Sequence, residues 1–263
     1  MNKCKNFLKD GMIGKLDCFD KKLNWLPEET EKDFQSRLKK QPENWIYRTE
    51  TITYTYNSNG HRCIDINDLT EGYILFAGCS HTEGVGLKLE HTYPYIVADH
   101  FKKQYYNLAL GGCGPDVAIF NLLGFLNKVK HKPSILVIQW PNFYRFFNLH
   151  QKGLQYFLTF YNATNDGNYY KHLFKHKIPF YQNLFNREYL LQNLKNHGIS
   201  NIIETLEPDV KQEEDPTVKV VIPMNPAIDF ARDLCHGGIK TNEVYAKRVI
   251  EAIDKNFAHV LSI

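Results

Sequence analysis

Short apolar runs that alternate with helical segments constrain the fold of this chain more than any other feature. The runs expected to form strands are rich in Ile, Leu, Val and aromatic residues and lie at 73–77, 105–109, 135–138, 202–203 and 218–222. The segments expected to form helices lie at 92–101, 115–132, 184–196 and 244–257, and a charged segment at 28–40 is also expected to be helical. Alternating strands and helices form a parallel sheet with helices on both faces. The sequence therefore predicts an α/β protein.

Residues 1–70 follow a different pattern. They are predicted to form an N-terminal extension of the α/β domain, which spans residues 71–263. Between 51 and 57, Thr alternates with Ile or Tyr, which is the period-2 pattern of a strand. Residues 57–60 have the composition of a turn, and a second strand is expected near 63–64. The extension is therefore predicted to contain a β-hairpin.

Bulk properties exclude several classes of partner. The net charge of +3 is too small to indicate nucleic acid or an acidic membrane surface. No apolar run approaches the roughly 20 residues of a membrane span, and residues 1–10 lack the apolar centre of a signal peptide. The six cysteines are scattered, without a CxxC pair, which is typical of reduced thiols inside a cell. We expect a cytoplasmic protein with no nucleic-acid or membrane partner; no oligomeric state is favoured.

Candidate catalytic residues follow the predicted strands, because ligands of open parallel sheets bind beyond the carboxyl ends of the strands. Ser80 comes directly after the first strand, in a turn introduced by Gly78. A serine hydroxyl is a weak nucleophile and needs a positioned base. Gly111 and Gly112 follow the second strand, where a glycine lets the backbone approach a substrate. Taken alone, each glycine turn is more simply an ordinary connection between a strand and a helix.

A carboxylate and an imidazole stand three residues apart near the C-terminus, at Asp233 and His236. In a turn, such an Asp can accept the Nδ1–H of the His ring, which fixes the tautomer and leaves Nε2 free as a base toward a serine. The chain has 11 histidines, so a single one is a weak candidate. The Asp partner and the glycines that follow make His236 the strongest of them.

Three blocks of residues resemble those of the SGNH (GDSL-like) hydrolases. Residues 78–84, GCSHTEG, are similar to the first block, usually written GDSxTxG. Residues 107–112, NLALGG, resemble the second block, and residues 229–237 resemble the last block, DxxH. The matched order covers about residues 73–257. Residues 54–62 also resemble a segment that precedes the first block in some relatives.

The resemblance implies a three-layer α/β/α sandwich around a flavodoxin-like parallel sheet. It implies a catalytic triad of Ser80, Asp233 and His236, and an oxyanion hole that includes the backbone N–H groups of Ser80 and Gly112. Asn142 is the candidate for the asparagine of the third block, usually GxND, and for a further oxyanion donor. Its alternative is a turn-forming Asn after a proline. No metal or organic cofactor is expected.

The sequence also departs from the family pattern. Cys79 replaces the usual Asp of the first block, and Trp140 and Phe143 replace the Gly and Asp of the third. Cys79, Cys113 and Cys235 all flank proposed site positions, which leaves a thiol cluster, a metal site or a cysteine nucleophile as alternatives. Small buried packing residues are the favoured interpretation of these cysteines.

Residues 143–181 are rich in Phe and Tyr and follow the third block, where an insertion would cover the site. These aromatics fit either a surface that stacks on sugar rings or lines an acyl pocket, or a small satellite core.

The function predicted is that of a serine esterase that hydrolyses short-chain esters, with an O-acetyl group on a carbohydrate as the first substrate expected and a lipid or other short-chain ester as the second. Transfer of the acyl group to a sugar uses the same residues. A non-catalytic carbohydrate-binding or structural module is the alternative from another class.

Overall fold

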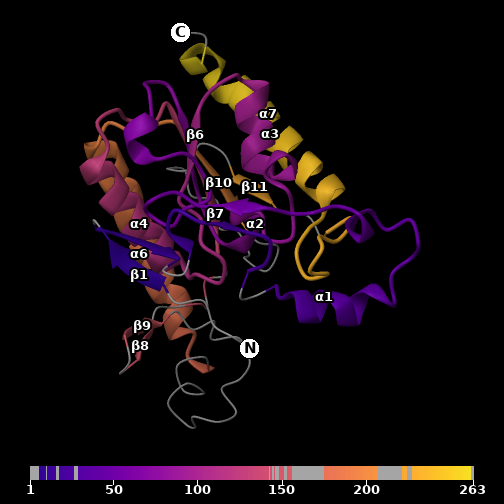
Figure 1. Ribbon diagram of the computed structural model, residues 1–263. Helices are drawn as coiled ribbons and strands as arrows, with labels where there is room; N and C mark the ends of the chain where they lie inside the picture. Colours follow the sequence, from indigo (N-terminus) through magenta and orange to yellow (C-terminus); the bar gives the residue numbers. More distant parts are fainter. Residues whose placement is uncertain are drawn as a thin grey trace.

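The centre of the protein is a five-stranded sheet in which all neighbouring strands are parallel (Figure 1). The computed structural model describes residues 6–9, 11–15, 18–26, 29–141, 143, 145, 148–150, 153–155, 175–206, 221–223 and 227–261. The strands of the sheet are β5 (Ile74–Ala77), β6 (Tyr105–Asn107), β7 (Ile135–Trp140), β10 (Ile202–Leu206) and β11 (Val221–Pro223). Their order, β11-β10-β7-β5-β6, is the flavodoxin order, so the predicted sheet is confirmed.

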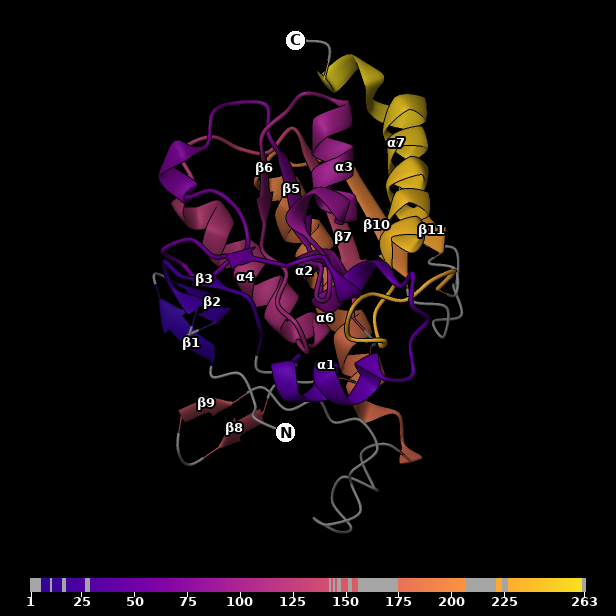
Figure 2. The same ribbon diagram turned by 45° about the vertical axis from the view of Figure 1, so that its right-hand side comes forward.

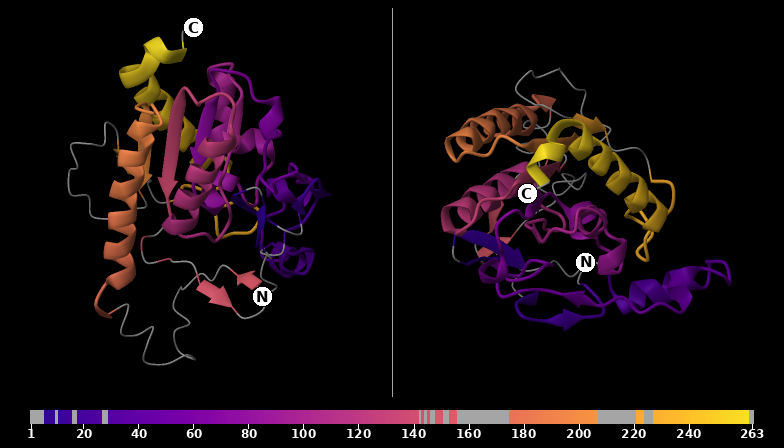
Figure 3. Two further views of the ribbon diagram at one scale, coloured as in Figure 1. Left: turned by 90° about the vertical axis from the view of Figure 1, so that its left-hand side faces the viewer. Right: turned by 90° about the horizontal axis from the view of Figure 1, so that it is seen from above.

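Two helical layers cover the sheet (Figure 3). Helices α3 (Tyr93–His100) and α7 (Ile239–Leu261) pack on one face, and α4 (Pro115–Lys128) and α6 (Ile178–Asn196) pack on the other. Successive strand residues point to opposite faces, so Ile74 and Phe76 enter the core under α3 and α7, whereas Leu75 and Ala77 enter the core under α4 and α6. The three-layer α/β/α sandwich predicted from the motifs is confirmed.

Local sequence signals account for the helix ends. Thr92 precedes α3, and proline stands within the first turn of α3, α4 and α6, where its missing N–H costs no hydrogen bond. After α6, Gly198 adopts a φ of +75°, which suits a helix C-terminus. Both α6 and α7 begin earlier than the sequence predicts, at Ile178 and Ile239.

The extension forms short antiparallel pairs. Strands β1 (Asn6–Lys9) and β2 (Met12–Lys15) form a hairpin, and β3 (Lys22–Leu23) pairs with β4 (Tyr54–Thr55). Helix α1 spans Glu31–Leu38. The remaining short elements are the 3-10 turns η2 (Ile46–Arg48), η3 (Ile66–Asp68) and η4 (Leu89–His91), the helix α2 (Ser80–Glu83), and the hairpin strands β8 (Asn148–His150) and β9 (Gly153–Gln155).

The hairpin predicted across residues 57–60 is wrong. Strand β4 pairs with β3, and residues 61–64 form no strand. The reason lies in Asn57, whose Oδ1 accepts hydrogen bonds from the backbone N–H groups of Asn59 and His61 at 3.0 Å each. Its Nδ2 donates to the backbone oxygen of Ile64 at 2.8 Å. The side chain thus takes backbone groups that a strand ladder would use, and the chain closes into a compact loop.

The extension packs against the α/β domain. Its buried residues, among them Ile52 and Tyr54, share one apolar cluster with Val85, Leu87 and Ala231 of the domain. Figure 2 shows α1 below the carboxyl ends of the sheet strands, beside the segment that leads into α7. The extension therefore packs beside the edge of the sheet where the candidate site lies.

Part of the aromatic-rich segment belongs to the main core. Phe143 is buried, and its ring lies 5.9 Å from the rings of both Trp140 and Phe180. Residues 156–174 lie outside the described residues, so a role of the segment over the site stays a prediction. In the part of the chain that the structure describes, no helix is both long and apolar enough to cross a membrane.

Candidate active site

Ser80 lies at the carboxyl end of β5, where the chain turns from the strand into the one-turn helix α2. The turn is tight: a Cβ on Gly78 would lie 2.3 Å from Thr82 Oγ1 and 3.0 Å from the backbone oxygen of Gln139. Only glycine fits at this position. Ser80, at the first position of α2, keeps 9% of its surface exposed. Strand β5 lies between β6 and β7, at the point where the strand order reverses, which is where ligands bind to such sheets.

Asp233 and His236 lie in a loop of residues 229–238, which we call the histidine loop. Backbone hydrogen bonds close it from Ala231 N to His236 O, at 2.9 Å, and from Gly238 N to Asp229 O, at 2.8 Å. Leu234 at its tip has a φ of +57°, an uncommon conformation for a residue with a branched side chain. The loop thus folds back on itself and presents Asp233 and His236 toward Ser80.

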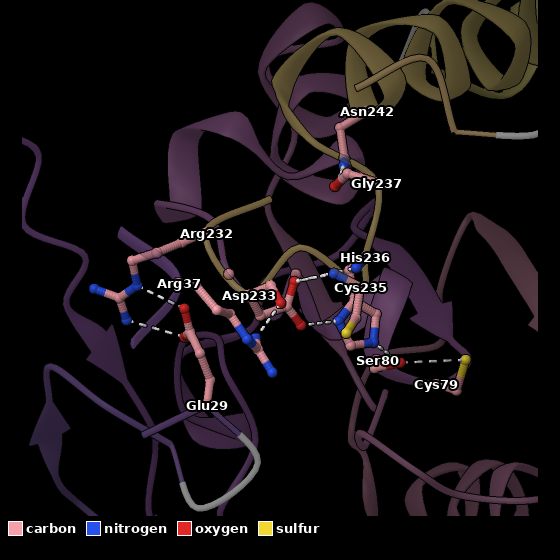
Figure 4. Close-up of polar contacts among 12 residues, drawn as sticks. Glu29, Arg37, Cys79, Ser80, Arg232, Asp233, Cys235, His236, Gly237 and Asn242 are labelled. Carbon is pink, nitrogen blue, oxygen red and sulfur yellow. Dashed lines mark hydrogen bonds and ion pairs between the residues drawn. The ribbon is translucent and has the colours of Figure 1, made fainter. Parts of the chain in front are cut away.

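The three side chains form one hydrogen-bonded row (Figure 4). His236 Nε2 lies 2.7 Å from Ser80 Oγ, and His236 Nδ1 bonds to Asp233 Oδ2. The second carboxylate oxygen, Asp233 Oδ1, accepts the backbone N–H groups of Cys235 at 3.0 Å and His236 at 3.1 Å. An ionised carboxylate only accepts, so Nδ1 carries the proton and Nε2 accepts the hydrogen bond of the serine hydroxyl.

The electrostatics of the row suit a histidine base. Burial would raise the pKa of Asp233, but hydrogen bonds from the His236 ring and from two backbone N–H groups hold that pKa below its usual value. The carboxylate is therefore charged wherever a histidine titrates. Burial and the neighbouring His236 lower the pKa of His81 to about 4. Its ring meets the His236 ring edge to face, with centroids 5.0 Å apart, so a neutral imidazole flanks the base.

The second block reaches the same edge of the sheet. Gly112 follows β6 with a φ of +80°, which only glycine adopts readily. The preceding Gly111 donates its backbone N–H to Glu83 Oε2, and Glu83 is the last residue of α2. This contact fixes the glycine turn to the helix that begins at Ser80.

Glu83 is itself buried and contacts several segments of the chain. Its Oε1 lies 2.5 Å from Lys15 Nζ of β2 and accepts the hydroxyl of Tyr56 at 2.5 Å. Both charged side chains are almost fully buried, at 0–1% exposure. Glu83 therefore joins the extension, the turn at Ser80 and the second block.

Removal of the Glu83 carboxylate should destabilise the protein strongly. We expect Glu83→Ala to lower the free energy of unfolding by about 3–5 kcal/mol, because the Lys15 ammonium stays buried without this counter-charge. The double variant Lys15→Met, Glu83→Gln should recover much of the loss, since neither member of the pair is then charged. Urea unfolding measures both. A loss below about 1 kcal/mol in Glu83→Ala would contradict the buried charge pair.

The cysteines near the site are free thiols. Cys79 is buried with its Sγ 3.9 Å from Ser80 Oγ, and Cys235 is exposed. Burial and the charge of Asp233 raise the pKa of Cys235, which lowers the thiolate fraction at neutral pH. Among the described residues, no three His, Cys, Asp or Glu side chains gather as a metal site would require. The side chain that lies within hydrogen-bond distance of His236 Nε2 is the Ser80 hydroxyl, at 2.7 Å.

Asn142 lies outside the described residues, so its place at the oxyanion hole stays a prediction. Its neighbour Trp140 has a structural role that explains one departure from the family pattern. Trp140 is fully buried, and its Nε1 donates to Glu204 Oε1 at 2.5 Å, while Arg187 binds both oxygens of the same carboxylate at 2.8 Å. A glycine at this position would leave that buried network incomplete.

Several residues at the site escape the sequence analysis, above all Glu83, Glu29, Arg37 and Arg232. Glu83 and Arg232 lie within the first and last motif blocks, and the resemblance at residues 54–62 is a further signal near them. Tyr54 accepts the Gly86 N–H at 2.9 Å, and Arg62 donates to the backbone oxygens of Gly84, at 2.7 Å, and Leu87, at 2.8 Å. This segment thus supports the turn that follows α2.

Comparison with solved structures finds carbohydrate esterases and other esterases. No protein-family model and no curated protein matches the sequence. A family two carbohydrate esterase from Clostridium thermocellum in complex with cellohexaose is 15% identical, with a TM-score of 0.46; the match covers 72% of this chain and 65% of that one. The acetyl xylan esterase Est2A from the rumen bacterium Butyrivibrio proteoclasticus is 13% identical, with a TM-score of 0.47 and the same coverages. TesA is 11% identical over 70% of this chain and 99% of that one, with a TM-score of 0.47.

The chain thus spans about two thirds of the length of the first two structures it matches. In its strand order, and in the placement of its first, second and last motif blocks at one edge of the sheet, the chain resembles the SGNH hydrolases.

Proposed function

We propose that this chain is a serine esterase of the SGNH type, with Ser80 as the nucleophile, His236 as the general base and then acid, and Asp233 as the residue that orients His236. One observation carries the proposal: His236 Nε2 lies 2.7 Å from Ser80 Oγ, while its Nδ1 is bonded to the Asp233 carboxylate. A nucleophile, a base within hydrogen-bond reach and a group that orients the base are the elements of acyl transfer through a serine.

In the first half of the reaction, Ser80 Oγ attacks the ester carbonyl and passes its proton to His236 Nε2. The tetrahedral intermediate then collapses, and the same proton moves to the leaving alcohol, which leaves an acyl group on Ser80. In the second half, His236 takes a proton from water as the water oxygen attacks the acyl carbon. The second tetrahedral intermediate then collapses: the bond between Ser80 Oγ and the acyl group breaks, Ser80 Oγ takes the proton back from His236, and the carboxylic acid leaves. Asp233 stays ionised throughout and stabilises the imidazolium, consistent with its lowered pKa.

The developing oxyanion needs hydrogen-bond donors that are already in place. We assign this role to the backbone N–H groups of Ser80 and Gly112, with the side chain of Asn142 as a third donor. Support comes from the glycine-only conformation of Gly112 and from the Glu83 contact that fixes Gly111 to α2. The substrate that we propose is a short-chain ester, with an O-acetyl group on a carbohydrate as the first candidate, on the strength of the motif resemblance.

The test combines turnover with active-site labelling. Purified full-length protein is assayed with nitrophenyl acetate and butyrate and with an O-acetylated oligosaccharide. An organophosphonate probe, which traps activated serines, should attach to the peptide that contains Ser80, and His236→Ala should abolish the labelling because the hydroxyl then has no base. Heat-denatured protein is the control for non-specific reaction.

Three outcomes would redirect the proposal. Activity that survives Ser80→Ala but disappears when a thiol reagent modifies Cys79 or Cys235 would indicate a cysteine nucleophile. Acyl transfer to an added sugar in preference to water would indicate an acyltransferase that uses the same residues. A folded protein that binds oligosaccharide, hydrolyses no ester and takes up no probe would indicate a non-catalytic binding module.

A further inference from the structure

Two arginines connect the N-terminal extension to the histidine loop. Arg232, the neighbour of Asp233, donates from Nε to Glu29 Oε1 at 2.6 Å and from Nη2 to Glu29 Oε2 at 2.9 Å (Figure 4). Arg37 of α1 donates from Nη1 to the backbone oxygen of Asp233 itself. Glu29 and Arg37 are 196 or more residues away from their partners in sequence, so the extension reaches the acid of the proposed triad directly.

The first of these contacts is buried and sterically defined. Glu29 is 2% exposed and Arg232 is 3% exposed. The guanidinium carbon of Arg232 lies 3.9 Å from the centre of the Trp25 ring, and Nη2 also donates to the backbone oxygen of Asn24 at 2.8 Å. Tyr54 donates its hydroxyl to Glu29 Oε2. A planar guanidinium that is bound at two nitrogens and stacked on an aromatic ring has one orientation.

Hydrogen bonds hold the backbone of the histidine loop on two sides. On one side, Arg232 N donates to Gly86 O, in the turn that follows α2, at 3.1 Å, and Asp233 O accepts from Arg37 of the extension. On the side of α7, Asn242 Nδ2 donates to the backbone oxygens of Gly237 and Gly238 at 3.0 Å each. Asp233 and His236 lie between these two anchors.

We propose that Arg37 and Arg232, together with Glu29, are positioning residues that hold Asp233 in line with His236, and that the N-terminal extension is thereby part of the catalytic unit. The inference rests on the proposed function for its kinetic consequence. None of the three residues bonds to Ser80 or His236, so they act through the backbone at Asp233. A displacement of about 1 Å in such a row can cost on the order of a hundredfold in rate.

Arg48 provides a matched control. It also belongs to the extension and also donates to backbone oxygens, those of Pro42 at 2.7 Å and Leu38 at 2.9 Å. Its described partners all lie within the extension and none lies in the histidine loop. Arg48→Ala therefore removes the same kind of contact from the same segment of the chain and leaves the Asp233 backbone untouched.

The experiment compares Arg37→Ala, Arg232→Lys and Arg48→Ala in the full-length protein, with thermal melts to show that each is folded. We expect Arg37→Ala and Arg232→Lys to lower kcat for nitrophenyl acetate about tenfold to a hundredfold. Their KM should stay within about twofold of wild type, since no substrate contact is removed. Arg48→Ala should leave both constants unchanged, and Arg37→Lys should recover part of the loss because it restores a donor to Asp233 O.

A second measurement reports the position of Asp233 without turnover. The proton between His236 Nδ1 and Asp233 should give a far-downfield NMR resonance, assigned by its loss in His236→Gln. It should be visible in wild type and Arg48→Ala, and broadened or absent in Arg37→Ala and Arg232→Lys. This resonance is measured without turnover, so it separates the two proposals. A wild type that hydrolyses no ester and takes up no probe, but shows the resonance, would overturn the esterase and leave the positioning role standing.

The positioning role is overturned if Arg37→Ala and Arg232→Lys keep both the resonance and kcat, or if Arg48→Ala lowers kcat as much as they do. In the second case, the extension would contribute general stability only.

Discussion

Ser80→Ala should lower kcat for a short-chain ester by on the order of a millionfold, and His236→Ala should lower it by a similar factor. The reason is the 2.7 Å hydrogen bond between Ser80 Oγ and His236 Nε2. Without the hydroxyl there is no nucleophile, and without the imidazole the hydroxyl stays protonated. Because the two residues act as a unit, the double variant should be no worse than either single variant. Steady-state kinetics on nitrophenyl acetate measure all three.

Ser134→Ala is the control for the removal of a serine hydroxyl. Ser134 directly precedes β7, at the amino edge of the sheet opposite the candidate site, and its backbone N–H donates to Tyr73 O. Its variant should keep the wild-type kcat. If Ser80→Ala keeps more than about one hundredth of the wild-type kcat, Ser80 is not the nucleophile. Losses that multiply in the double variant would mean that Ser80 and His236 act in separate steps.

The framework of the fold is predictable from the sequence because it depends on local patterns. The core strands are short apolar runs such as residues 135–138, and Pro115 marks the start of α4. The order of the strands is predicted from the resemblance of the motif blocks to a family with a flavodoxin-like sheet. The hairpin expected after Asn57 fails because the Asn57 side chain binds the backbone of the residues that follow it. An alternating strand pattern cannot show such a competing contact.

The residues at the site also divide into those that a local sequence pattern marks and those that no local pattern marks. Asp233 and His236 are found because the contact between them spans only three residues, and Ser80 is found because it directly follows a strand. The partners of Arg232 and Asp233 in the extension, Glu29 and Arg37, could not be found. No local pattern marks a residue for a contact across about 200 positions, and charged residues on a short helix are usually solvated.

Buried charges explain why these distant partners matter. The Arg232–Glu29 pair and the Lys15–Glu83 pair are both almost free of solvent, and each joins the extension to a segment that carries a candidate catalytic residue. The desolvation cost of such a pair can exceed its Coulomb gain, so a buried pair is weak evidence of stabilisation. Each pair fixes the position of one segment relative to another. The 2.7 Å hydrogen bond between Ser80 Oγ and His236 Nε2 requires such fixed positions.

Asp233→Asn should lower kcat about ten-thousandfold while the fold stays intact. The geometry gives the reason. Asp233 Oδ1 accepts two backbone N–H groups, from Cys235 and His236, so the amide of the variant will place its oxygen there. Its NH2 group then faces His236 Nδ1, where the carboxylate oxygen lies in the native protein. A donor at this position requires an unprotonated Nδ1, and the ring proton moves to Nε2.

With the proton on Nε2, His236 can no longer accept the hydrogen of the Ser80 hydroxyl, although every atom stays close to its native place. Asp229→Asn is the matched control, because Asp229 lies in the same histidine loop and accepts the backbone N–H groups of Lys240 and Thr241 at the start of α7. That variant should lower the melting temperature but leave kcat within a few fold, since it removes no contact to the His236 ring. Nitrogen NMR of the His236 ring identifies the tautomer directly. A kcat within about tenfold of wild type in Asp233→Asn, with the proton still on Nδ1, would show that Asp233 does not set the tautomer.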